Sequence, residues 1–162
     1  MYFCTMSTFR TNEIPFEQTG QFDRLFLDYI AEKETLRPFY NTQPDVAAIA
    51  QSAAQLNFTP AARNLLADVI AAQYKRSDIT VPETLLQQLR QENTFTVCTG
   101  HQLCLFTGPL YFIYKIATAI RLAGELTKAD PSKTFLPVYW MASEDHDFDE
   151  IASVHLFGKT VT

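Results

Sequence analysis

Cysteine, glycine and positively charged residues are all scarce in this chain. Each of these shortages excludes certain kinds of site, fold or partner. The three cysteines are an odd number without CxxC spacing, so neither a disulfide framework nor a cysteine-rich zinc site is indicated. The five glycines and eight prolines are few, and no repeat or low-complexity stretch is visible, which is typical of a folded globular protein. Thirteen basic against eighteen acidic residues leave a net charge of −5, and we therefore expect no nucleic-acid partner.

Long apolar runs are missing as well. No uncharged apolar segment reaches the roughly 20 residues that cross a bilayer, so we expect no membrane partner. The first residues lack the basic and apolar regions of a signal peptide, and a cytoplasmic protein is the expectation. The 162 residues are 47% hydrophobic and 13% aromatic, which favours one domain with a packed core.

The pattern of residues 1–93 predicts a helical N-terminal segment (a lead-in to the first strand) that packs on a sheet. Apolar residues recur there at helical spacing between proline and polar breaks, and Thr59-Pro60 is a typical helix start. The predicted helices span residues 22–34, 45–56, 61–74 and 82–90. None of them carries a group of polar side chains with evident chemistry.

From residue 94 onward the pattern becomes strand, helix, strand. Residues 94–98 alternate and are rich in β-branched types, residues 110–126 have helical spacing, and residues 135–141 form a near-continuous apolar run, as in a strand covered on both faces. The fold class is therefore α/β with a parallel sheet, and 94–162 supplies its first βαβ unit. Because two or three strands make a poor sheet, we expect the sheet to be incomplete and truncated at the C-terminus.

Three finer expectations follow from the same patterns. Cys98 on the first strand is expected to be a small buried hydrophobe, and a further strand is expected around 151–156. The buried face of the 110–126 helix is expected to carry its apolar residues at helical spacing, which are Leu110, Ile113, Ala117, Ile120 and Gly124.

A polar cluster follows each predicted strand. His101, Gln102 and Cys104 follow the first, and five acids and one histidine lie within residues 143–150 after the second. Parallel strands joined by a helix end at the same edge of the sheet, where open α/β folds bind ligands. We therefore expect the two clusters to meet. Cys104 is either a nucleophile or a packing residue of the loop, and no group that would activate its thiol is evident.

The sequence Thr107-Gly108-Pro109 opens the helix and is expected to hold an anion, either a phosphate or a carboxylate. Proline is tolerated at the first helical position, glycine lets a ligand approach the backbone, and the first N–H groups of a helix are free. Tyr111 and Lys115 share one helix face, and helical side chains lean toward the N-terminus, so Lys115 is expected to reach the helix start. The alternative is a capped helix with a surface lysine.

The run Glu144-Asp145-His146-Asp147 can bind a cation or an amine, or supply an acid–base pair. Its Asp-His-Asp part is also typical of metal-dependent hydrolases, in which hard carboxylates with one histidine suit Mg²⁺ or Mn²⁺ better than zinc. A solvated acidic turn is the remaining alternative, although such turns usually lack a histidine directly after an apolar strand.

Together, the two clusters resemble the bacillithiol biosynthesis cysteine-adding enzyme family. The similarity is carried by TVCTGHQ at 96–102, LFTGPLY at 105–111, IYK at 113–115 and PVYWMASEDHDFDE at 137–150. Such a pair of long, ordered motifs is specific, and the close similarity covers roughly residues 94–158. This sequence departs from the family at His101, where glutamine is usual, and at Cys104, where a small residue is usual.

The resemblance implies a Rossmann-like core in a parent protein several times longer, which dimerises with itself through a coiled coil. It implies that the parent ligates L-cysteine to glucosaminyl-malate by forming an amide, and that the present chain alone is inactive. No metal and no certain cofactor are implied, and a nucleotide, ATP or ADP, stays open. The implied catalytic residues are His146, Asp145 and Lys115. The implied substrate-binding residues are Gln102, Thr107, Gly108, Pro109, Tyr111, Glu144 and Asp147.

Two other functions stay open at this point. One is a metal-dependent hydrolase that uses Asp145, His146 and Asp147, and the other is a non-catalytic binding module that keeps only the first strands of the fold. A metal titration separates the hydrolase from the ligase, because the ligase interpretation predicts no tight divalent site.

Overall fold

The computed structural model describes residues 12–104, 108–145 and 148–162. The chain divides into two compact units, Met1–Pro44 and Asp45–Thr162. Within its described residues the first unit consists of short helices only. These are α1 (Phe16–Thr19), α2 (Arg24–Ile30) and the 3-10 helix η1 (Glu34–Phe39).

The first unit is held by aromatic contacts rather than by one long helix. The Phe22 ring stacks on Phe26 and meets Phe16 edge-on, both at 4.7 Å between ring centroids. Asp23 caps α2 by accepting a 2.7 Å hydrogen bond from the Phe26 N–H. The predicted 22–34 helix was too long, because Glu32 adopts a φ of +53°, which a right-handed helix cannot continue.

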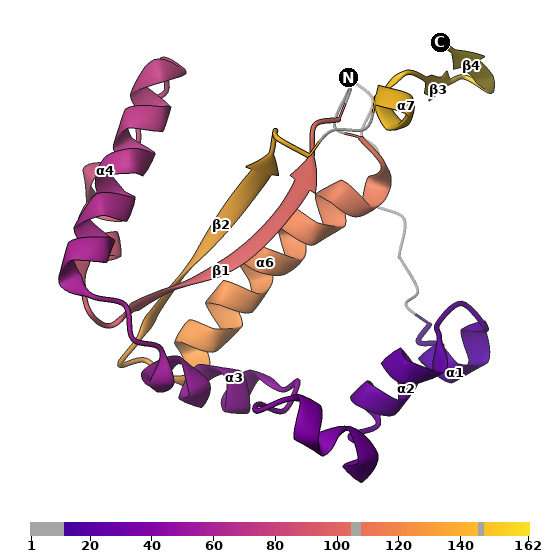
Figure 1. Cartoon of the computed structure of the whole chain (residues 1–162), viewed down its shortest axis with the longest axis horizontal. Coiled ribbons are helices and arrows are strands. Elements are labelled where there is room, and N and C mark those ends of the chain that lie inside the picture. Colours follow the sequence, from indigo (N-terminus) through magenta and orange to yellow (C-terminus); the bar gives the residue numbers. More distant parts are fainter. Residues whose placement is uncertain (1–11, 105–107, 146–147) are drawn as a thin grey trace, which may run out of the picture. The chain divides into compact units, whose positions relative to one another are not determined.

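The second unit is built around two parallel strands. Its elements are α3 (Val46–Ser52), η2 (Ala53–Gln55), α4 (Pro60–Arg76), α5 (Glu83–Arg90), β1 (Thr94–Gln102), α6 (Leu110–Ala129), β2 (Thr134–Ala142), α7 (Phe148–Ile151), β3 (Val154–Leu156) and β4 (Lys159–Val161). Strands β1 and β2 pair in parallel, and α6 connects them and runs alongside both (Figure 1). The predicted strand–helix–strand unit is confirmed.

Strands β1 and β2 are both longer than predicted, and β3 starts later in the sequence than predicted. The register of β1 and β2 runs from Thr94 beside Thr134 to Gln102 beside Ala142. Strands β3 and β4 form an antiparallel pair. The strand expected around 151–156 begins only at Val154, because α7 occupies the residues before it.

The helix starts of this unit follow their local signals. Thr59 accepts a 3.2 Å hydrogen bond from the Ala62 N–H, and Pro60 is the first residue of α4, as predicted. Asp45 caps α3 in the same way through the Ala48 N–H at 2.9 Å. The predicted 45–56 helix changes to a 3-10 turn within this range, so α3 is shorter than expected.

Two apolar clusters lie on opposite faces of β2. Successive strand residues point to opposite sides, so Phe135 joins one cluster with residues of α3, η2 and α6, and Leu136 packs against the other, which α4 and α5 supply. The buried members of the first cluster are Ala50, Ala53, Ala123, Leu126 and Phe135. Those of the second cluster are Ala67, Leu86 and Leu89.

The predicted buried face of α6 was wrong. Leu110, Ile113 and Ile120 are 64%, 49% and 56% exposed, and Ala117 and Gly124 are exposed too. The residues that α6 buries are Ala119, Ala123 and Leu126. Both sets recur at helical spacing, so the spacing alone does not identify the buried face. In the described ranges, no helix, α6 included, is long and apolar enough to cross a membrane.

The carboxyl half of the sheet is more open than predicted. Cys98 is exposed, in contrast to the expected buried position, and Trp140 and Met141 at the end of β2 are 61% and 55% exposed. The expectation of a strand covered on both faces therefore holds only for its first half. The α4–α5 cluster contacts β2 at Leu136, and it leaves the residues beyond uncovered.

The turn from α6 to β2 carries a pH-dependent interaction. Asp130 pairs with the Lys133 ammonium and accepts hydrogen bonds from the Ser132 hydroxyl and N–H. The Lys133 ammonium, and then Ser132, lower the pKa of Asp130 from 3.8 to about 2. Folding therefore favours the ionised carboxylate, so its contribution to stability is present above about pH 4 and is lost as the pH falls toward 2.

We expect Asp130→Asn to remove this acid sensitivity. The melting temperature of the wild type should fall more steeply between pH 4 and 2 than that of the variant, because only the wild type loses the interaction of the charged carboxylate. The measurement is thermal unfolding by circular dichroism from pH 6 to pH 2. Glu92→Gln, which removes another exposed carboxylate, should follow the wild type. Parallel curves for wild type and Asp130→Asn would contradict this assignment.

Candidate functional site

The two polar clusters follow neighbouring strand ends. Gln102, the last residue of β1, lies beside Ala142, the last residue of β2. Glu144 and Asp145 come directly after β2 in an exposed turn. Because the strands are parallel, both clusters start at the same edge of the sheet, as the sequence predicted.

His101 and Tyr111 form the closest polar contact at this edge. The Nε2 atom of His101 lies 2.5 Å from the Tyr111 hydroxyl, and its Nδ1 atom lies 2.9 Å from the Gln102 carbonyl oxygen. A carbonyl oxygen only accepts, so Nδ1 carries the proton. In the neutral imidazole Nε2 then accepts from the Tyr111 hydroxyl. This leaves the lone pairs of the Tyr111 oxygen available to donors on a ligand.

Two aromatic residues, Phe112 and Tyr139, contact the His101 side of this pair. The Phe112 ring lies edge-on to both the His101 ring, at 5.9 Å, and the Tyr139 ring, at 5.4 Å between centroids. The Tyr139 hydroxyl donates a 3.4 Å hydrogen bond to the His101 carbonyl oxygen. Burial, and then the neighbouring Cys104, raise the pKa of Tyr139, so this phenol stays protonated. Tyr139 was not predicted as a site residue, because its position in a strand does not distinguish it from a core aromatic.

Helix α6 begins at Leu110, as the helical spacing predicted, but the expected role of Pro109 differs. Pro109 is the N-cap with an extended ψ of 153°, not the first helical residue, and it gives no side-chain cap. The first N–H groups of a helix lack partners within the helix, and here no capping side chain from Pro109 covers them. The expected anion site at this helix start stays a prediction, since Thr107 lies outside the described residues.

Gly108 has a backbone conformation and a neighbour that both require glycine. Its φ is +62°, and a Cβ atom added there would lie 2.8 Å from both Cβ and Sγ of Cys104. The side chain of Cys104 thus packs against the open face of Gly108. This contact supports the packing alternative for Cys104 over a role as nucleophile.

Lys115 leans toward the start of α6. Its Nζ atom lies 5.7 Å from the centroid of the Tyr111 ring, one helical turn earlier, which is within the range of a cation–π contact. The side chain is exposed.

Three predicted site residues lie outside the described residues: Thr107, His146 and Asp147. Their roles stay predictions, as does the expected contact of His146 with the cluster that follows β1. Over 12–104, 108–145 and 148–162, no group of three or more metal-ligating side chains is found.

Comparison with known proteins agrees with the resemblance seen in the motifs. A family model described as "Bacillithiol biosynthesis BshC, N-terminal Rossmann-like domain" matches residues 9–162. A protein of Cytophaga hutchinsonii is 41% identical over 160 residues, and one of Christiangramia forsetii is 44% identical over 156 residues. Both carry the name "Putative cysteine ligase BshC".

These relatives are much longer than the chain. The alignments cover 97% and 92% of this chain but only 30% and 28% of the two relatives. A third relative, from Flavobacterium psychrophilum, is 38% identical over 94% of this chain and 29% of its own length. The chain thus spans less than a third of the length of the curated relatives it matches.

Proposed function

This chain belongs to the BshC family of bacillithiol biosynthesis, as its N-terminal Rossmann-like domain, and from that premise we propose that it supplies the substrate pocket of a cysteine ligase. The whole protein would join L-cysteine to glucosaminyl-malate. The observation that carries the proposal is the family match over residues 9–162. The hydrolase alternative has no comparable support.

The geometry of the sheet edge supports this role. Parallel pairing brings the end of β1 beside the end of β2, so a ligand at this edge can contact both clusters. In this proposal the start of α6 and the Lys115 ammonium bind the carboxylates of the malate part. The carboxylates of Glu144 and Asp145 bind the ammonium groups of cysteine or glucosamine.

The chemistry needs a neutral amine. In the proposed reaction the glucosamine amine attacks the cysteine carboxyl carbon, so a C–N bond forms and a C–O bond breaks. The departing oxygen leaves as water, or with an activating group if the carboxyl is activated first. We propose that His146 takes the proton from the ammonium, because imidazole titrates near neutral pH, and that Asp145 orients it.

A direct assay tests the proposal. The full-length protein is incubated with L-cysteine and glucosaminyl-malate, with and without ATP, and the amide product is measured by mass spectrometry. Product that depends on the protein supports a ligase, and the ATP comparison shows whether a nucleotide takes part. If no product forms under either condition while the protein is folded, the proposed function is wrong.

We expect Lys115→Met to weaken the binding of glucosaminyl-malate. Losing one charge-assisted contact to a carboxylate should lower the affinity about ten- to a hundredfold. The measurement is isothermal titration calorimetry on the full-length protein. Lys128→Met, an exposed lysine in the last turn of the same helix, should leave the affinity unchanged. Equal affinity in wild type and Lys115→Met would make Lys115 a surface residue with no role in binding.

Location and assembly are further parts of the proposal. The family resemblance supports a cytoplasmic protein that forms a homodimer through a coiled coil. In the relatives, about 70% of the length lies outside the matched region. Sedimentation of the full-length protein tests the dimer directly.

A further inference from the structure

Arg63 in α4 is an almost fully buried cation. Its residue is 5% exposed, and its guanidinium lies against two aromatic rings, 5.4 Å from the centroid of Phe58 and 5.8 Å from that of Phe95. It donates hydrogen bonds from Nη1 to the Thr94 carbonyl oxygen at 2.6 Å and from Nη2 to the Glu92 carbonyl oxygen at 3.0 Å. Its Nε has no hydrogen-bond partner.

Within the described part of the chain, the charge of Arg63 lacks an acidic partner. None of the ion pairs found among the described residues includes this side chain. Buried arginines are normally paired with an acid, because removing a charge from water is costly. Two carbonyl oxygens satisfy part of the hydrogen-bonding capacity of the guanidinium, which has five N–H donors, but they do not neutralise it.

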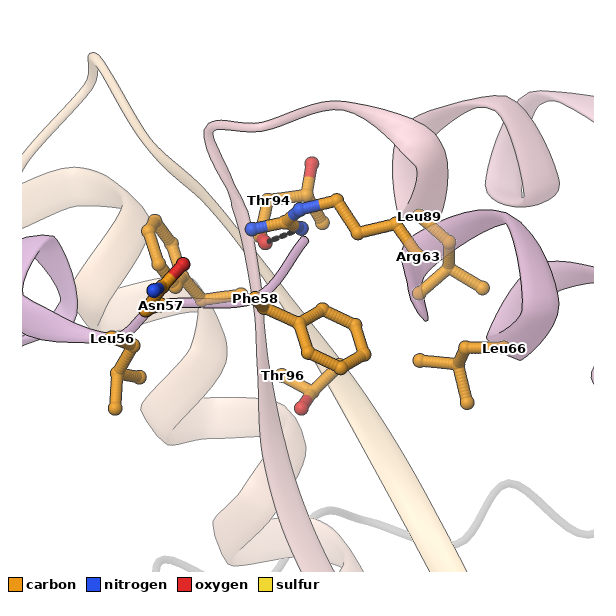
Figure 2. Close-up of a pocket in the computed structure, with 9 residues that line it drawn as sticks. Leu56, Asn57, Phe58, Arg63, Leu66, Leu89, Thr94 and Thr96 are labelled. Atoms are coloured by element: carbon orange, nitrogen blue, oxygen red, sulfur yellow. Dashed lines mark hydrogen bonds between the residues drawn. The ribbon is translucent and has the colours of Figure 1, made fainter. Parts of the chain in front are cut away.

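A cavity of about 280 Å³ lies beside this cation. Figure 2 shows the Arg63 side chain reaching from α4 toward β1, where its dashed hydrogen bond meets Thr94. The remaining walls are mostly apolar and include Leu56, Phe58, Leu66 and Leu89. Among the described residues that line the cavity, Arg63 alone carries a charge.

We propose that this cavity binds a small carboxylate with an apolar body. The carboxylate would neutralise Arg63 and accept from guanidinium N–H groups that the two carbonyls leave unused, and the body would lie against the apolar walls. Phe58 and Leu56 are 45% and 66% exposed, so solvent reaches these two walls of the cavity. The volume lies just below the roughly 300–1,000 Å³ of typical ligand pockets, which limits the ligand to a small one.

This site is separate from the proposed pocket for ligation. The cavity borders Thr94 and Thr96 at the amino end of β1, whereas the polar clusters lie at its carboxyl end beside Gln102. The proposal therefore does not depend on the ligase activity. A carboxylate bound here would also hold α4 against the start of β1.

Benzoate and benzamide test the proposal as a matched pair, because they share a shape and differ in charge. Each is titrated into the full-length protein and followed by ligand-observed NMR. We expect benzoate to bind at least tenfold more tightly than benzamide. Equal affinities would mean that the cavity is merely apolar, and no binding of either at millimolar concentrations would mean that it is not a site. Both results overturn the proposal.

A second arm locates the binding. Thr96 is an exposed residue of the cavity wall, so Thr96→Phe should fill the space without removing a buried group. Cys98→Phe is the matched control, since Cys98 lies two residues along the same face of β1, is exposed and does not line the cavity. We expect Thr96→Phe to abolish benzoate binding and Cys98→Phe to retain it, with similar melting temperatures. Benzoate affinity that survives Thr96→Phe would place the site elsewhere.

Discussion

Replacing His146 with alanine in the full-length protein is expected to abolish amide formation. A positioned general base typically contributes about 10²–10⁴-fold to a rate, and a protonated glucosamine amine cannot attack. The turnover number should therefore fall by about this factor, while the affinity for glucosaminyl-malate changes little. Single-turnover product formation, followed by mass spectrometry, gives the rate, and calorimetry gives the affinity.

The matched control for this variant is His155→Ala. His155 lies on β3, is exposed, and shares a 2.9 Å hydrogen bond with the Thr160 hydroxyl. Its loss should leave the rate within about twofold of the wild type, as for surface substitutions away from a site. If His146→Ala kept the wild-type rate, His146 would have no acid–base role, even if the protein proved to be a ligase.

Gly108→Ala is expected to have the largest effect on stability. A residue with a side chain pays about 1–2 kcal/mol in the left-handed conformation, and overpacking against a neighbour adds about 1–3 kcal/mol. The sum, about 2–5 kcal/mol, should appear as a lower free energy of unfolding in urea. The clash involves Cβ of Cys104 as well as its Sγ, so a rotation of the cysteine side chain cannot relieve all of it.

The chain offers controls for both parts of this prediction. Gly20 has a similar φ of +64° with nothing within 4 Å of an added Cβ, so Gly20→Ala should show only the conformational part. In a double-mutant cycle, Cys104→Gly should recover the contact part of the Gly108→Ala loss. If Gly20→Ala and Gly108→Ala lowered the free energy of unfolding equally, and Cys104→Gly recovered none of the loss, the contact with Cys104 would not affect stability.

Elements with strong local signals were predictable from the sequence. The start of α4 follows from a capping threonine before a proline, and α5 (Glu83–Arg90) was expected at 82–90. The parallel pair β1 and β2 followed from two apolar segments separated by a helix of crossover length. The common edge of the two polar clusters could be predicted for the same reason, because topology alone determines it.

Features that depend on tertiary packing were not predictable. α6 carries two apolar stripes, and periodicity cannot tell which one meets the sheet. In the structure the buried stripe is the one with Ala119, Ala123 and Leu126. Cys98 is exposed because no described element covers that part of β1. Arg63 is buried although arginine side chains are mostly exposed, and only its contacts with the carbonyls of Glu92 and Thr94 reveal this.

The hydrogen bond from Arg63 to the Thr94 carbonyl oxygen also bears on the order in which the elements fold during synthesis. It joins residues 31 positions apart, and translation produces α4 and α5 before β1, and β1 before β2. The start of β1 can therefore contact α4 through this bond before β2 is available to pair with it. An unpaired strand edge is a template for aggregation, and contact with Arg63 would hold one end of β1 on a helix before β2 pairs with it.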